Sequence, residues 1–317
     1  MPLGVRVRVP LEALTGPCRY PARMADETST PTTTSTGTAG DEEPLTVGDG
    51  VDLLREAAPA ELAEDWDSNT LICGDPADPV RTVLLAMDPL TAVVDEAIER
   101  GVDMVITHHP LFLRGTDHVG AVDPKGRIVH RLVRAGIALA NAHTSWDSAR
   151  GGNADALADL LGLTGTVPLE PADADPALGI GRVGSLPAST TLRALAEDVA
   201  RALPDTAPGL LVGGDPEVLV ERVAVSGGAG DSLLGAAREA GADVFLTADL
   251  RHHPASDHLE GGRPYLLCGT HWATEWVGLP PLARRLETGA AQRGRTLTAH
   301  VSTVVTDPWT LRLSTGS

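Results

Sequence analysis

Apolar and polar positions along the first half of the folded part of the chain predict strands separated by helices. Short apolar runs rich in β-branched residues are typical of buried strands. The runs predicted as strands are 80–87, 102–107 and 136–142, and the segments predicted as helices are 47–58, 91–100 and 126–135. Because strand and helix alternate, we expect an α/β fold.

The strand–helix–strand unit around residue 100 recurs later in the chain at a constant offset of 140 residues. Corresponding positions are Gly101 with Gly241, Asp103 with Asp243, and Thr107 with Thr247. Chance similarity is the alternative, because strand–helix–strand units resemble one another in general. We favour an internal repeat, and we therefore predict two similar α/β lobes with mixed sheets.

Composition shifts along the chain predict where the lobes begin and end. Residues 28–43 are Thr, Ser, Gly, Pro and acidic residues with almost no apolar side chains, which is typical of disorder. The low-complexity run 171–176 is a candidate lobe boundary. The expected parts are a disordered N-terminal extension at 1–44, a first lobe at 45–170, a second lobe at 171–268 and a C-terminal segment at 269–317.

The charge of the chain narrows the function classes. A formal net charge of −18 argues against binding the phosphate backbone of a nucleic acid, which needs a basic surface. No apolar run reaches the ~18 residues that a membrane helix needs. The three cysteines are scattered without a Cys-x-x-Cys pair, and the N-terminus lacks a clear signal sequence. We expect a cytoplasmic protein with no nucleic-acid or membrane partner.

Two adjacent histidines, His108 and His109, follow the predicted strand 102–107. Ligands usually bind at the carboxyl ends of strands in α/β sheets. Neighbouring side chains at a strand end point in different directions, so this pair could reach two separate metal ions. The alternative is a polar strand end with two solvated histidines.

Further candidate ligands occur downstream. His271 and Glu275 are four residues apart, which places both side chains on one face of a helix. Gly269 and Thr270 provide a turn and a helix cap before them. A surface ion pair or hydrogen bond is the alternative for this spacing. Asp147 ends the stretch 143–147, which follows another predicted strand, and is an acidic residue at a loop tip.

Six short motifs together carry a resemblance to one family. They are EDWDSN at 64–69, THHP at 107–110, HTSWD at 143–147 with Gly152 and Asn153, SGGAG at 226–230, TADLRHH at 247–253 and HWATE at 271–275. With these motifs in order, residues 46–312 resemble the Nif-three-like proteins, dinuclear metal centre proteins also called type 2 GTP cyclohydrolase I. Thr270 and Ala248 stand where that family usually has glycine, and neither is an expected ligand.

The resemblance implies a fold and a metal site. It implies two related α/β domains, a metal site in the cleft between them, and a C-terminal strand at 296–306 that returns to the first domain. It also implies two divalent ions. His109 and Asp147 would hold one ion, His108 and His271 the other, and Glu275 would bridge both. Imidazoles with two carboxylates suit Zn, Fe, Mn or Ni better than Mg or Ca.

The function implied by the resemblance is hydrolysis. A metal-activated water would open the purine ring of GTP and release formate, so the expected partner is a small-molecule substrate such as a nucleotide. The family also implies a ring-shaped homohexamer. The alternative is a non-catalytic protein that handles metals or acts as an interaction scaffold.

Several other residues are weaker candidates. Asp249 and His253 could line the cleft as catalytic acid, base or substrate ligand, or belong to a solvated loop. His143 could orient a metal ligand or be satisfied by backbone. The glycine-rich stretch 227–230 could bind phosphate at a helix N-terminus or form a tight turn. The histidines predicted to lie on the surface are His118, His130, His258 and His300.

Overall fold

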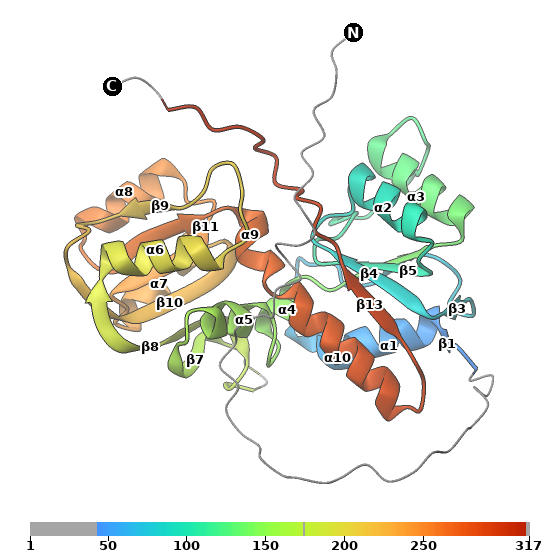
Figure 1. Cartoon of the computed structure of the whole chain (residues 1–317), viewed down its shortest axis with the longest axis horizontal. Helices are drawn as coiled ribbons and strands as arrows, with labels where there is room; N and C mark the ends of the chain where they lie inside the picture. The colour runs from blue at the N-terminus through green and yellow to red at the C-terminus, as the bar shows by residue number, and fades with distance from the viewer. Residues whose placement is uncertain (1–42, 174, 315–317) are drawn as a thin grey trace, which may run out of the picture. The chain divides into compact units, whose positions relative to one another are not determined.

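The computed structural model describes residues 43–173 and 175–314. This part of the chain is mixed α/β, with two large sheets and a small two-stranded one (Figure 1). The predicted fold class is therefore confirmed. The expected N-terminal extension lies outside the described residues, apart from Glu43 and Pro44. None of the helices in the described ranges is long and apolar enough to cross a membrane.

The first sheet has five strands, and all but its last strand run parallel to their neighbours. In spatial order they are β13 (Thr298–Val301), β4 (Thr82–Ala86), β5 (Met104–Thr107), β6 (Ala138–Asn141) and β2 (Leu71–Cys73). Helices α1 (Val47–Ala57) and α10 (Leu279–Gln292) cover one face, and α2 (Thr91–Arg100) and α3 (Pro124–Ala135) cover the other (Figure 1).

Strand β4 explains why the sequence pattern is apolar at consecutive positions. Val83 and Leu85 pack into the core beneath α1 and α10, whereas Leu84 and Ala86 pack into the core beneath α2 and α3. A parallel strand with helices on both faces must be apolar on both. All four side chains are buried, so this strand forms the centre of the first lobe.

The second sheet has six strands with mixed directions. In spatial order they are β7 (Thr164–Pro171), β8 (Gly179–Thr191), β10 (Leu219–Ala229), β11 (Val244–Ala248), β12 (Tyr265–Gly269) and β9 (Leu211–Gly213). Helices α5 (Asn153–Leu160) and α6 (Leu192–Ala202) pack on one face, and α7 (Leu234–Glu239) and α8 (His252–Glu260) on the other. Strand β7 belongs to this sheet, so the sheet begins before the expected boundary at residue 171.

The internal repeat is visible in the strand register. Val83 pairs with Met104 in the first sheet, and Val223 pairs with Val244 in the second, at the same offset. The aspartate at the start of each second strand has the same role. Asp103 Oδ2 accepts hydrogen bonds from the backbone N–H of Arg81 and Thr82 at 2.8 Å. Asp243 Oδ2 accepts them from Glu221 and Arg222 at 2.9 Å.

The C-terminal part of the chain contributes a strand to the first sheet. Strand β13 pairs in parallel with β4, with Thr298 opposite Thr82. The strand is shorter than the expected range 296–306, and Ser302 continues it with one backbone hydrogen bond to Leu85. The remaining elements are β1 (Leu45–Thr46), β3 (Pro79–Val80), α4 (Thr144–Ser148), α9 (His271–Trp276) and the short helices η2 (Ala60–Leu62) and η3 (Asp231–Leu233).

Candidate metal centre

The five expected metal ligands come from the carboxyl ends of strands in both sheets. His108 and His109 follow β5 directly, and Asp147 lies on α4, which begins just after β6. His271 and Glu275 lie on α9, which follows β12. Thr270 caps α9 by accepting a hydrogen bond from the backbone N–H of Ala273 at 3.3 Å. The predicted turn and cap thus place His271 in the first turn of the helix.

Glu275 lies at the centre of the group. Its Oε1 atom is 3.5 Å from His108 Nε2, and its Oε2 atom is 3.0 Å from His109 Nε2 and 3.2 Å from His271 Nε2. His108 Nε2 is also 3.6 Å from Asp147 Oδ1. Two groups of possible ligands therefore share Glu275, one with His108 and Asp147 and the other with His109 and His271.

This grouping differs from the expected pairing, in which His109 went with Asp147 and His108 with His271. His108 faces α4 and is buried, with only 3% of the residue exposed. His109 instead faces α9, with its Nε2 atom 3.2 Å from His271 Nε2. Adjacent residues at a strand end point to opposite sides, but the sequence does not tell which side each one takes.

The chemistry of the group fits divalent metal ions. Glu275 Oε2 and His108 Nε2 are buried atoms without a hydrogen-bond partner in the described part of the chain. Buried polar atoms left in this way cost free energy, and ligation to a cation offsets that cost. Imidazole nitrogens combined with carboxylate oxygens favour Zn, Fe, Mn or Ni. Each of the two groups supplies three protein ligands, which leaves coordination positions for water or substrate.

The electrostatics of the site point to the same conclusion. Burial opposes a positive charge on His271, but the carboxylate of Glu275 raises the pKa of His271 to about 9. Burial likewise opposes the charge of His109, and Glu275 and Asp88 raise its pKa well above the ordinary value. Burial disfavours the charged form of Glu275, but the three neighbouring histidines lower its pKa well below the usual range. Glu275 is thus an anion that attracts cations.

Each histidine at the site is held through its Nδ1 atom. His109 Nδ1 donates to Asp88 at 2.8 Å, and His271 Nδ1 donates to Asp249 at 2.8 Å. His108 Nδ1 lies 3.2 Å from the backbone oxygen of Ala142. A hydrogen bond at Nδ1 fixes the tautomer and leaves Nε2 free to bind a metal. Asp249, expected as a catalytic residue, thus orients His271.

His143 has the same arrangement. Its Nδ1 atom donates to Asp67 at 2.7 Å, and its ring centre is 5.1 Å from that of His108. Burial would raise the pKa of Asp67, but hydrogen bonds from His143 and Thr144 lower it well below the usual range. His143 forms a further possible ligand group with His108 and His109. A carboxylate, and not the backbone, therefore holds His143.

The sequence did not reveal the partners Asp67 and Asp88. Asp67 lies within the motif 64–69, but its hydrogen-bond partner His143 is 76 residues away. Asn153 is a third such residue, since its side-chain N–H donates to Asp147 Oδ1 at 2.9 Å. Its place in the motif with Gly152 was the only signal available.

The glycine-rich stretch lies against the carboxylate of Glu275. Residues 226–229 belong to β10, and Gly228 has a φ of +67°. A Cβ atom on Gly228 would lie 2.2 Å from Glu275 Oε1. The backbone N–H of Gly228 donates to Thr274 Oγ1 at 3.1 Å. The stretch therefore allows close approach of Glu275, a role that neither sequence interpretation included.

A cavity of about 380 Å³ opens beside the second ligand group. It is lined by Asp88, His109, Pro208, Asp249, Thr270, His271, Trp272, Thr306, Asp307, Pro308 and Trp309.

His253 does not belong to the lining of this cavity. It is exposed on α8, and its ring packs against that of His252. The surface prediction for His258 was wrong: this residue is 8% exposed, and its Nε2 atom bonds to the backbone oxygen of Pro264.

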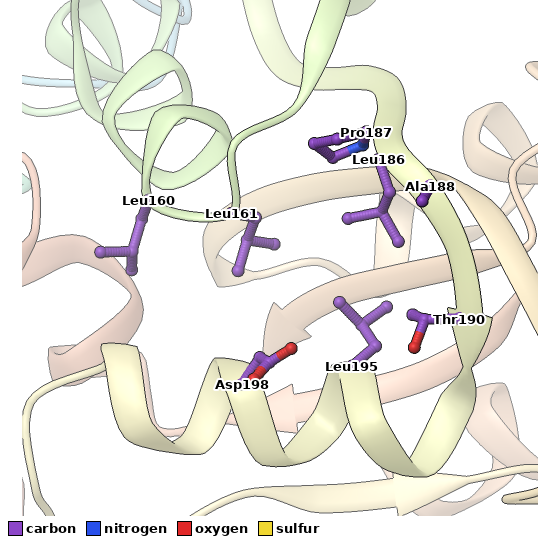
Figure 2. A pocket seen from close by; sticks show the side chains of 8 residues that line it. All are labelled: Leu160, Leu161, Leu186, Pro187, Ala188, Thr190, Leu195 and Asp198. Atoms are coloured by element: carbon purple, nitrogen blue, oxygen red, sulfur yellow. The ribbon is translucent and has the colours of Figure 1, made fainter. Parts of the chain in front are cut away.

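A second cavity, of about 330 Å³, lies away from these ligands between α5, β8 and α6. Figure 2 shows Leu160, Leu161, Leu186 and Leu195 around it. Its single carboxylate, Asp198, pairs with Arg201. The described residues of this lining include no histidine, and its one carboxylate is paired with an arginine, so we assign the chemistry to the other cavity.

Comparison with known proteins confirms the resemblance. The family model Duf34/NIF3 (NGG1p interacting factor 3) matches residues 45–308. A Streptomyces coelicolor protein named GTP cyclohydrolase 1 type 2 homolog is 48% identical over 81% of this chain and 90% of its own length. A Mycobacterium tuberculosis protein of the same name is 34% identical over 85% of this chain and 98% of its own length.

Solved structures agree with this result. A Staphylococcus aureus hypothetical protein aligns with a TM-score of 0.77 at 27% identity over 84% of this chain and 99% of its own. A Bacillus cereus protein related to NIF3 has the same fold, with a TM-score of 0.79 at 24% identity over 85% of this chain and 99% of its own. On the match of the family model and the identity of these relatives, the chain belongs to the Duf34/NIF3 family.

Proposed function

We propose that the chain is a dinuclear metal-dependent hydrolase that acts on a nucleotide-like substrate. The observation that carries this proposal is the position of Glu275, which is shared by two groups of ligands beside an open cavity. When bound, two adjacent divalent ions lower the pKa of a coordinated water to near neutral and supply a hydroxide nucleophile. The metal ligands in this proposal are His108, His109, Asp147, His271 and Glu275.

The two ligand groups differ in their access to the substrate. His109 and His271 line the cavity, so the ion that they hold would face the substrate. His108 and Glu275 are only 3% and 4% exposed, so the ion that they hold with Asp147 would be enclosed. Asp88 and Asp249 keep two of the imidazoles oriented. Asp249 also lines the cavity, where its carboxylate could accept a proton from a reacting group. We assign no step to His253.

The names of the relatives suggest the reaction class. Hydrolytic opening of a purine ring is compatible with an activated water at the cavity and with a nearby carboxylate that takes up protons. A protein that only stores or delivers metal would not need an open cavity at its ligands. The cavity beside His109 and His271 therefore favours catalysis over the metal-handling alternative.

Metal analysis followed by a substrate panel tests the proposal. The purified chain is loaded in turn with Zn²⁺, Mn²⁺, Fe²⁺ and Ni²⁺ and incubated with purine nucleotides, nucleosides, phosphoesters and amides. Hydrolysis in the loaded protein and its loss in Glu275→Gln would support the proposal. Two bound ions without turnover of any member of the panel would favour the metal-handling role. The homohexamer also stays a prediction. Light scattering tests it by measuring the mass of the assembly in solution.

A further inference from the structure

The C-terminal segment places a tryptophan at the cavity that contains the metal ligands. Trp309 is 67% exposed, although it is a large aromatic side chain, and it lines the cavity together with His109 and His271. An exposed aromatic residue at a cavity with chemically active groups is typical of a ligand-binding surface. The flat face of an indole ring provides a stacking surface for a planar ring.

The backbone of the segment that carries Trp309 is held by neighbouring side chains. Asp307 Oδ1 accepts a hydrogen bond from the backbone N–H of Trp309 at 3.0 Å, which forms a tight turn around Pro308. Thr306 donates through its hydroxyl to Asp88 Oδ2 at 2.5 Å, and Asp88 in turn holds His109. The segment that carries Trp309 is therefore tied to a proposed metal ligand through one shared carboxylate.

The charge of the cavity limits the kind of ligand that fits. Its lining contains the carboxylates Asp88, Asp249 and Asp307, and among the described residues that form it there is no Arg or Lys. Asp147 and Glu275 bring the number of carboxylates to five. Their five negative charges exceed the four positive charges of two divalent ions by one. Proteins bind phosphate chains with Arg, Lys or helix N-termini that point at them, and a triphosphate would find no Arg or Lys side chain among the described residues of this lining.

We propose that Trp309 stacks on a planar heteroaromatic ring of low negative charge, such as a nucleobase or nucleoside, and that the site does not recognise a triphosphate tail. This inference rests on the proposed function and narrows its substrate class. A ring stacked on Trp309 would lie in the same cavity as His109 and His271. A triphosphate could bind only by taking the open metal positions itself, which would remove the attacking water.

Calorimetric titration tests the inference without relying on turnover. Protein loaded with Mn²⁺ and freed of excess metal is titrated with guanosine and, separately, with GTP. Guanosine should bind at least as tightly as GTP. Trp309→Ala should weaken guanosine binding by about five-fold or more, because stacking on an aromatic residue is worth at least that factor. Leu311→Ala is the control, because this residue is also exposed on the same segment but lies outside the cavity lining.

The opposite results would overturn the inference. They are GTP binding more than ten-fold tighter than guanosine, an unchanged guanosine Kd in Trp309→Ala, or an equal loss in Leu311→Ala. A change of oligomeric mass in Trp309→Ala, measured by light scattering, would also overturn it, because Trp309 would then pack against a second copy. The metal content of the same samples separates this inference from the proposed function. A chain with no bound ions contradicts both, whereas a loaded chain that fails to bind guanosine contradicts only the inference.

Discussion

Gly228 and Glu275 approach each other so closely that a Cβ atom on Gly228 would lie 2.2 Å from Glu275 Oε1. The two residues come from β10 and α9, which are far apart in the sequence. A carboxylate that is enclosed in this way keeps one orientation, and a bridge between two ions needs a fixed orientation of both oxygens. We therefore expect Gly228 to have a role in the candidate metal site without supplying a ligand atom.

The close contact between Gly228 and Glu275 predicts that the variant Gly228→Ala binds less metal. The new methyl group must displace Glu275, and the φ of +67° adds strain of about 1 kcal/mol. Gly241→Ala is the matched control, since Gly241 has a φ of +69° but nothing within 4 Å of an added Cβ atom. We expect both variants to have a lower free energy of unfolding in chelator and only Gly228→Ala to bind fewer ions. Equal metal content in the two variants would contradict this role.

Asp88 is predicted to strengthen metal binding through His109. Asp88→Asn removes the anionic acceptor for His109 Nδ1, and loss of such a partner typically weakens metal affinity about 10- to 100-fold. Asp117→Asn is a suitable control, because Asp117 makes a similar 2.8 Å contact with His118 Nδ1 on the exposed surface. Competition with a metal chelator measures both affinities. The assignment fails if the two substitutions have the same effect.

The histidine pKa values predict how the stability of the metal-free protein depends on pH. Glu275 raises the pKa of His109 and His271 in the folded chain, that of His271 to about 9. A histidine whose pKa is raised by folding stabilises the folded state. This stabilisation is complete when the pH is below the pKa of the unfolded chain, ~6.5, and it is lost as the pH rises through the pKa of the folded chain. The Tm measured in chelator should therefore decrease as the pH is raised from 6.5 to 9.

Metal loading should remove this pH dependence, because a bound cation replaces the protons on the ligand nitrogens. Glu275→Gln should also flatten the profile of the metal-free protein, since the carboxylate that raises both pKa values is absent. Thermal unfolding of the three samples at matched ionic strength provides the comparison. A metal-free Tm that stays constant or rises over this pH range would show that these histidines are not paired with Glu275.

Much of the fold could be predicted from the sequence because its signals are local. The apolar run at 80–87 identified β4, and the repeat at Gly101 and Gly241 identified equivalent strand–helix–strand units. The candidate ligand residues could be predicted because each one follows a strand or lies on a short helix with a characteristic motif. Thr270 and Gly269 predicted the start of α9 correctly.

Features that depend on long-range contacts could not be predicted. The sequence places His108 beside His109 but does not show that His108 faces Asp147 and His109 faces His271. Asp67 and Asp88 act on histidines through side-chain hydrogen bonds across 76 and 21 residues, and neither shares a local motif with its partner. The close approach of Gly228 to Glu275 likewise depends on how β10 packs against α9.

The number of metal ions bound by Glu275→Gln tests the central claim most directly. Elemental analysis is performed on the unmodified chain, Glu275→Gln, His108→Ala and the control Asp159→Asn, which changes an exposed acid on α5. The account predicts two ions per chain for the unmodified protein and the control. It predicts one for His108→Ala, because His109, His271 and Glu275 remain, and close to none for Glu275→Gln. Two ions retained by Glu275→Gln would contradict the shared carboxylate and the hydrolytic site built on it.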